Sequence, residues 1–118
     1  MIKLEISEIP ASLNVWSNWH WAKKAVYKEL WENLIMAEVR NKKLKRIKGK
    51  VNIVLVFYFK HTLRDLDNFV IKGLIDGLKK YLIQDDSVEY IERIILEFGG
   101  KSNKNKTEIK IFSKEGEL

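Results

Sequence analysis

The sequence predicts an α+β protein with two layers, in which one mixed β-sheet carries two helices on one face. Two stretches repeat apolar residues at helical spacing, and four others alternate or are continuously apolar, as strands are. Their order along the chain is β-α-β-α-β-β. The 118 residues, 46% of them hydrophobic, fit a single domain over residues 1–118 with one core.

The first predicted strand covers residues 1–9, which alternate loosely, and Pro10 ends it. Residues 10–18 are expected to form a loop. The first helix is expected over residues 19–41, which lack glycine and proline, and its tryptophans are interpreted as core anchors. Its apolar stripe consists of Ala22, Val26, Leu30, Leu34 and Ala37, with Tyr27, Trp31 and Ile35 alongside.

Residues 51–60 read VNIVLVFYFK and are apolar on both faces, which predicts a central strand. A second helix is expected over residues 69–82, with Asp67 or Asn68 as its N-cap and the QDDS sequence as the turn that follows. The stripe of this helix is Ile71, Leu74, Ile75, Leu78 and Leu82.

Residues 88–98 alternate, which predicts a half-buried strand with Val88, Tyr90, Ile94, Leu96 and Phe98 on one face. TEIKIF, residues 107–112, predicts the last strand. Because a short loop with Gly99 and Gly100 separates these two strands, they are expected to pair as a hairpin.

The net charge of +6 favours polyanionic partners such as nucleic acid. Residues 39–50 carry seven Lys or Arg and no acid, and residues 99–106 add three lysines. The alternative is that both runs are solvated loops. The absence of cysteine excludes disulfides and thiolate metal sites. No apolar run approaches the ~20 residues of a membrane span, and no signal-peptide pattern is present, so we expect a cytoplasmic protein.

All five aspartates fall within residues 65–86. If the preceding strand continues, Asp65 and Asp67 point to the same side, and Asp85 or Asp86 can approach them where the chain returns. Three carboxylates without His or Cys suit Mg²⁺, for which Mn²⁺ could substitute, and in a basic protein such a site fits phosphodiester hydrolysis. The alternative is that aspartates here only cap helices and form turns.

Lys72 lies one turn into the second predicted helix, where its charge could stabilise a phosphate in the transition state. The alternative role for Lys72 is an ion pair with Asp76 at i,i+4, and the two roles are compatible. His20 and His61, the only histidines, are interpreted as structural or surface residues.

Three consecutive motifs, R-D-L-D-N from residue 64, K-x-x-x-D-x-L from residue 72 and D-D-S from residue 85, together resemble the signature of the RusA family of Holliday-junction resolvases. P-A-S-L-N at residues 10–14 resembles the family's N-terminal loop, and His20–Trp21 resembles a pairing found in some members. The resemblance implies a small, dimeric, Mg²⁺-dependent endonuclease of a kind often encoded in prophages. One residue more than in the best-known spacing separates Asn68 from Lys72, which a longer lead-in turn could absorb.

The resemblance also implies roles by position. Asp65, Asp67 and Asp86 match the catalytic, metal-binding carboxylates, with Asp85 as a further candidate ligand, and Lys72 matches the catalytic helix lysine. Asp76 matches the aspartate one turn later. For substrate binding we predict Asn14, Asn68, Arg64, Lys43, Lys45, Arg46 and Lys101.

The function expected from the sequence is a homodimeric endonuclease that resolves four-way DNA junctions by paired symmetric nicks. Two alternatives stay open. One is a basic module that binds nucleic acid without cutting it, and the other is a different Mg²⁺-dependent phosphodiesterase or phosphoryl-transfer enzyme. Against the latter, GGKS at residues 99–102 matches only the end of a P-loop motif, because Ile95 stands where the first glycine belongs.

Overall fold

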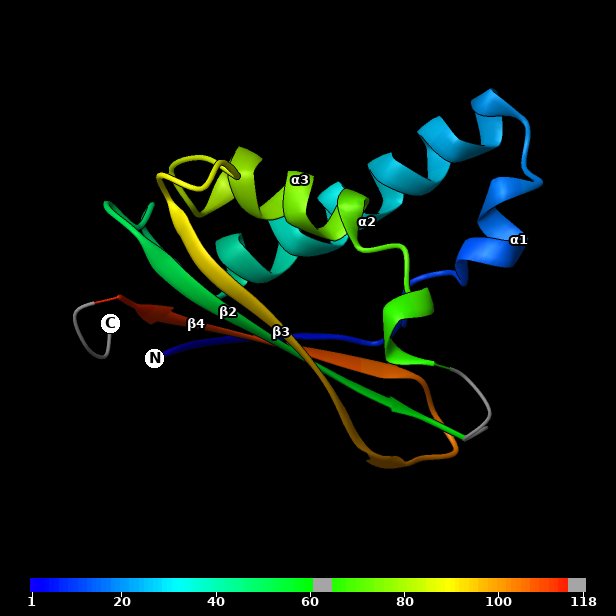
Figure 1. Ribbon diagram of the computed structural model, residues 1–118. Coiled ribbons are helices and arrows are strands. Elements are labelled where there is room, and N and C mark those ends of the chain that lie inside the picture. The colour runs from blue at the N-terminus through cyan, green and yellow to red at the C-terminus, as the bar shows by residue number, and fades with distance from the viewer. Residues whose placement is uncertain (61–64, 115–118) are drawn as a thin grey trace.

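The computed structural model is an α+β protein with a four-stranded mixed sheet, as the sequence predicts. It describes residues 1–60 and 65–114. Figure 1 shows the helices gathered over one face of the sheet. The strands are β1 (Ile2–Ile6), β2 (Val51–Phe59), β3 (Ile91–Lys101) and β4 (Lys106–Ser113).

The spatial order of the strands is β1-β4-β2-β3. β4 pairs antiparallel with both β1 and β2, and β2 pairs parallel with β3. The expected hairpin between β3 and β4 is therefore wrong, because β2 lies between them. Ile109 and Ile111 of β4 are fully buried. A strand in the middle of the sheet also pairs its backbone on both sides, which an edge hairpin would not give it.

The helical elements are α1 (Leu13–Ser17), α2 (Trp21–Asn41), the 3₁₀ turn η1 (Leu66–Asn68) and α3 (Lys72–Tyr81). α1 lies where a loop was expected. The Ser12 side chain accepts a hydrogen bond from the backbone N–H of Val15 (3.3 Å) and so caps this short helix. His20 caps α2 in the same way, through Nδ1 and the N–H of Ala22. None of the described helices combines the length and apolarity needed to cross a bilayer.

The face of α2 that meets the core is not the stripe expected from the sequence. Trp31 and Ile35 are buried, whereas Val26 is 66% exposed. Trp21, expected as a core anchor, is 74% exposed. Figure 1 shows the reason, since α2 rises away from the sheet towards its N-terminal end, so that its first turns do not meet the sheet.

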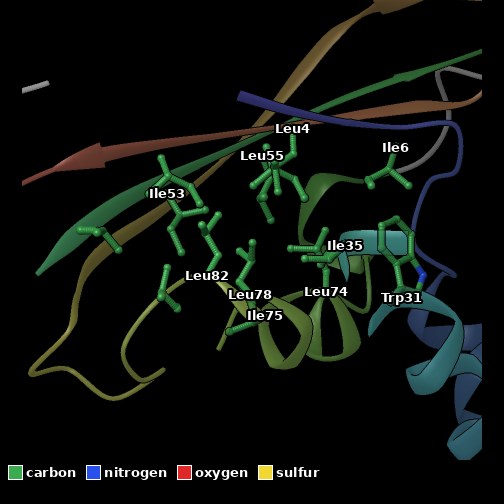
Figure 2. Packing of buried hydrophobic residues seen from close by; sticks show 14 of the residues in the cluster. Leu4, Ile6, Trp31, Ile35, Ile53, Leu55, Leu74, Ile75, Leu78 and Leu82 are labelled. Atoms are coloured by element: carbon green, nitrogen blue, oxygen red, sulfur yellow. The ribbon is translucent and has the colours of Figure 1, made fainter. Parts of the chain in front are cut away.

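The second helix follows the prediction more closely. α3 begins at Lys72 instead of residue 69, and its stripe is buried at Leu74, Ile75 and Leu78. Figure 2 shows Leu74 and Leu78 pointing from α3 towards the sheet that carries Ile53 and Leu55, with Leu74 beside Ile35 of α2. Gly77 permits the close approach of α2, because a Cβ atom there would lie 2.8 Å from Cδ1 of Ile35.

Candidate active site

Asp65 and Asp67 lie in the connection that leaves β2, where Asp65 immediately precedes the turn η1 and Asp67 lies within it. Both are exposed, and neither side chain forms an ion pair or hydrogen bond with another described residue. The arrangement considered from the sequence, in which the strand continues through both aspartates, is not found. β2 ends at Phe59, and the N–H of Asn68 donates to the carbonyl of Asp65 (3.1 Å). The turn therefore presents two carboxylates to solvent.

The turn is anchored by the residue that follows it. Phe69 is buried, and its ring stacks on Phe57 of β2 with centroids 4.2 Å apart. Phe69 also forms a β-bridge with Ser12. The expected cap of α3 by Asp67 or Asn68 is wrong, since Phe69 to Ile71 intervene and no side chain caps the helix.

The N-terminal loop packs against the same segment. The hydroxyl of Tyr27 accepts from the N–H of Ala11 (2.8 Å) and donates to the carbonyl of Val70 (3.2 Å), while the N–H of Val70 donates to the carbonyl of Ala11 (2.9 Å). Asn14 follows on α1, where it is exposed. The structure thus joins the loop that carries Asn14 to the segment just after Asn68.

Lys72 is the first residue of α3, and its side chain is 77% exposed. Its Nζ lies 3.6 Å from Oδ1 of Asp76, so the ion pair foreseen as an alternative is present. Oδ2 of Asp76 lies 3.7 Å from Nζ of Lys28 on α2. The pairing is loose and on the surface, which leaves the ammonium of Lys72 accessible to an anion.

Asp85 and Asp86 follow the opposite end of α3. Both carboxylates lie near Nζ of Lys79, at 3.4 and 3.6 Å. The backbone N–H of Asp86 and then the Lys79 ammonium lower the pKa of Asp85, and these carboxylates raise the pKa of Lys79. A ten-residue helix is about 15 Å long, so α3 separates this pair from η1, as Figure 1 also shows. Within one protomer the predicted carboxylates do not converge.

The segment at η1 offers two carboxylate groups, those of Asp65 and Asp67, as ligands for a metal ion. In the described part of the chain, no group of three or more His, Cys, Asp or Glu side chains is close enough to hold one. Mg²⁺ nevertheless often binds through one or two carboxylates together with water and substrate phosphates. The carboxylates of Asp65 and Asp67, which have no ion-pair partner among the described residues, fit that mode, whereas Asp85 and Asp86 share the ammonium of Lys79.

The predicted basic residues fall at both ends of the molecule. Lys43, Lys45 and Arg46 lie in the segment between α2 and β2, where the Arg46 guanidinium donates to the carbonyls of Lys79 (2.8 Å), Lys80 (2.6 Å) and Ile83. Arg46 thus caps the end of α3. Lys101 ends β3 beside the end of β2, since the next N–H donates to the carbonyl of Phe59. Arg64 lies outside the described residues.

Sequence reasoning missed a pocket near η1. Its volume is about 220 Å³, and it is lined by Trp16, Lys24, Ala25, Tyr27, Lys28, Val70, Lys72 and Gly73. The tryptophans were interpreted as core residues and the lysines of α2 were not singled out. The signal available in the sequence was the alternation of aromatic and basic residues over positions 16–28.

Comparison of the sequence with models of known protein families finds a match to one family. A family model described as Endodeoxyribonuclease RusA matches residues 14–112, which include η1, α3 and all the strands except β1. Among curated proteins, none matches the sequence.

Proposed function

Because the chain belongs to the RusA family of endodeoxyribonucleases, we propose that it resolves four-way DNA junctions by Mg²⁺-dependent, paired and symmetric nicks. The observation that carries the proposal is the family match together with the exposed carboxylates of Asp65 and Asp67 at η1, which have no ion-pair partner among the described residues. A DNA substrate also suits the charge of +6 and a location in the cytoplasm.

In this proposal Asp65 and Asp67 hold the metal ion. When bound, Mg²⁺ would polarise the scissile phosphodiester and favour attack by water. Lys72, exposed at the start of α3 just after the lead-in segment of residues 69–71, would contribute positive charge as negative charge grows on the phosphate. The products would carry 5′-phosphate and 3′-hydroxyl ends. Asn68, the last residue of η1, and Asn14, on the α1 helix whose N-cap Ser12 bridges to Phe69, would position the DNA strand.

Paired nicks on opposite strands require two sites related by a two-fold axis, so the proposal includes a homodimer. β3 is an edge strand that pairs only with β2 among the described strands. It exposes Ile94, Ile95 and Phe98, at 39%, 38% and 42%. A long edge with exposed apolar side chains favours pairing with another strand.

The charges of β3 suit a second copy of the same strand. Arg93, Ile95 and Glu97 share one face of the sheet, as their partners on β2 show. Neither Arg93 nor Glu97 makes an ion pair with another described residue. If two β3 strands pair antiparallel with Ile95 opposite Ile95, each Arg93 faces the partner's Glu97. Opposite charges at such positions stabilise antiparallel pairs.

The same arrangement gives Asp86 a place in the site. Antiparallel pairing sets the start of one β3 beside the end of the other. β3 contacts η1, and the Phe98 ring in its second half lies 4.9 Å from that of Phe59. Asp86 of the partner subunit, five residues before Ile91, would therefore approach the Asp65–Asp67 turn. The third carboxylate would come from the other protomer.

The experiment is cleavage of a labelled synthetic four-way junction, beside linear duplex, with Mg²⁺ or EDTA. Wild-type protein is expected to make paired nicks with Mg²⁺ only. Asp67→Asn is expected to lower the cleavage rate by roughly 10²–10³-fold or more while retaining DNA binding. Glu89→Gln, an exposed carboxylate elsewhere, is the matched control. Equal cleavage of duplex and junction, or full activity in EDTA, would contradict the proposal.

A further inference from the structure

The pocket of about 220 Å³ lies between α1 and the first turns of α2 and α3. Its lining includes the side chains of Trp16 and Tyr27 and the residue Val70, together with Lys24 and Lys28. The Tyr27 hydroxyl is engaged with two backbone groups, which fixes its ring. The pocket is therefore a preformed apolar slot with three lysines in its lining, of which Lys28 and Lys72 make loose surface ion pairs with Asp76.

Trp16 is the aromatic surface best placed to receive a ligand. It is half-buried, so part of its ring surface remains accessible. Nζ of Lys24 lies 4.1 Å from its ring centroid, which brings a cation to the aromatic face. An aromatic face beside lysines matches how proteins bind unpaired nucleotides, by stacking the base and contacting its phosphates.

The pocket adjoins the proposed cutting site. Val70, one of its walls, follows Asp67 by three residues, and Lys72 lines the pocket while standing at the start of α3. A strand held at η1 would thus have neighbouring nucleotides within reach of Trp16. Three lysines around an apolar slot favour a ligand with an apolar plane and flanking negative charges.

We propose that this pocket binds one unpaired nucleobase of the DNA strand, stacked on Trp16, with Lys24, Lys28 and Lys72 contacting the adjacent phosphates. The inference deepens the proposed function and rests on it for the junction as substrate. Bases at a branch point are the least costly to extrude, because their pairing and stacking are already disturbed. The pocket would then help to select branched over intact duplex DNA.

The test places the fluorescent base 2-aminopurine, in turn, at each position within three nucleotides of the crossover. Asp67→Asn protein is added in EDTA, so that binding is observed without cleavage. Stacking on tryptophan is expected to change 2-aminopurine fluorescence at one position. Trp16→Leu, which keeps apolar volume, is expected to abolish that change and weaken junction binding about tenfold. Trp21→Ala removes an exposed tryptophan that does not line the pocket and serves as control.

Single-stranded DNA labelled in the same way separates this inference from the proposed function. If junctions are not preferred but single strands give a Trp16-dependent signal, the proposed substrate fails and the base pocket stands. If junctions are bound and cut while Trp16→Leu and Trp21→Ala behave alike at every labelled position, the base pocket is overturned. Thermal unfolding of both variants checks that a lost signal does not come from a folding defect.

Discussion

At the scale of single residues, the aspartates have two electrostatic environments. Asp65 and Asp67 are exposed on η1 without a cationic partner among the described residues. Asp85 and Asp86 share the ammonium of Lys79. A carboxylate without a partner is free to bind an incoming cation, whereas a paired one must first give up its lysine. The metal ion is therefore expected to bind first at η1.

Glu108 is the charged residue with the clearest role in stability. It is 4% exposed on the sheet face away from the helices, and its Oε2 lies 2.6 Å from Nζ of Lys3. This ammonium, and then the hydroxyl of Tyr58, lower the pKa of Glu108. A carboxyl with a lowered pKa stabilises the fold above its unfolded pKa of about 4.3 and loses that contribution as pH falls through the folded value.

Glu108→Gln is therefore expected to reduce the free energy of unfolding by roughly 1–2 kcal/mol at pH 7, because it removes a buried charge-assisted contact. The difference from wild type should shrink progressively below about pH 4.3. Urea denaturation between pH 7 and pH 3 measures both effects, with the exposed Glu89→Gln as control. A difference that stays constant with pH would contradict the role assigned to the ionised carboxylate.

At the scale of elements, sequence patterns correctly predicted the segments in which the apolar residues of the local pattern are also the residues buried in the core. The stripe of α3 and the continuous apolar run of β2 meet the core as expected. α2 carries apolar residues on more than one face, so periodicity could not decide which face would meet the sheet. Which face of α2 is buried depends on how far the sheet extends beneath the helix, and this cannot be read from the residues of the helix itself.

The packing of α2 on α3 depends on Gly77. A Cβ atom at this position would lie 2.8 Å from Cδ1 of Ile35 and 3.2 Å from Cα of Glu32. Gly77→Ala is therefore expected to lower the free energy of unfolding by roughly 1–3 kcal/mol, despite the better helix propensity of alanine. Ile35→Val removes Cδ1, so the cost of Gly77→Ala should be smaller in that background. Equal costs in a double-mutant cycle would show that the contact is not limiting.

At the scale of the whole molecule, the sequence indicated which aspartates are candidate site residues, but it could not show which of them lie close together in space. The D-x-D motif and the later D-D pair stood out in the sequence. Whether they meet depends on α3, whose length of about 15 Å separates the D-D pair from the turn in one protomer. Arg46 was expected on the DNA surface and instead caps α3, which an isolated basic run could not reveal.

The proposed dimer can be tested by exchanging charges. Arg93→Glu and Glu97→Arg are each expected to place like charges opposite one another and to weaken self-association several-fold or more. The double variant with both changes restores opposite charges and should restore the dimer. Molar mass measured by light scattering over a dilution series gives the result. Two single variants that remain as dimeric as wild type would exclude this pairing of β3.

A mixture of inactive variants tests whether the site is shared. Asp67→Asn and Asp86→Asn are each expected to be inactive. In a mixed dimer with shared sites, one site combines Asp67 and Asp86 that are both intact, so single nicks should reappear on mixing. If each site belongs to one protomer, every site in the mixture carries a substitution and no activity returns. Cleavage of a labelled junction after refolding the mixture distinguishes the two cases.

The central place of β4 has a consequence for how the enzyme is made. β4 joins β1 to β2, yet its residues are translated after those of every other strand. A nascent chain that has not reached Lys106 holds two parts of a sheet without the strand between them. Because chains emerge from the ribosome N-terminus first, the turn that bears Asp65 and Asp67 is made well before the sheet that supports it can close. The nuclease should therefore gain activity only after β4 has been synthesised.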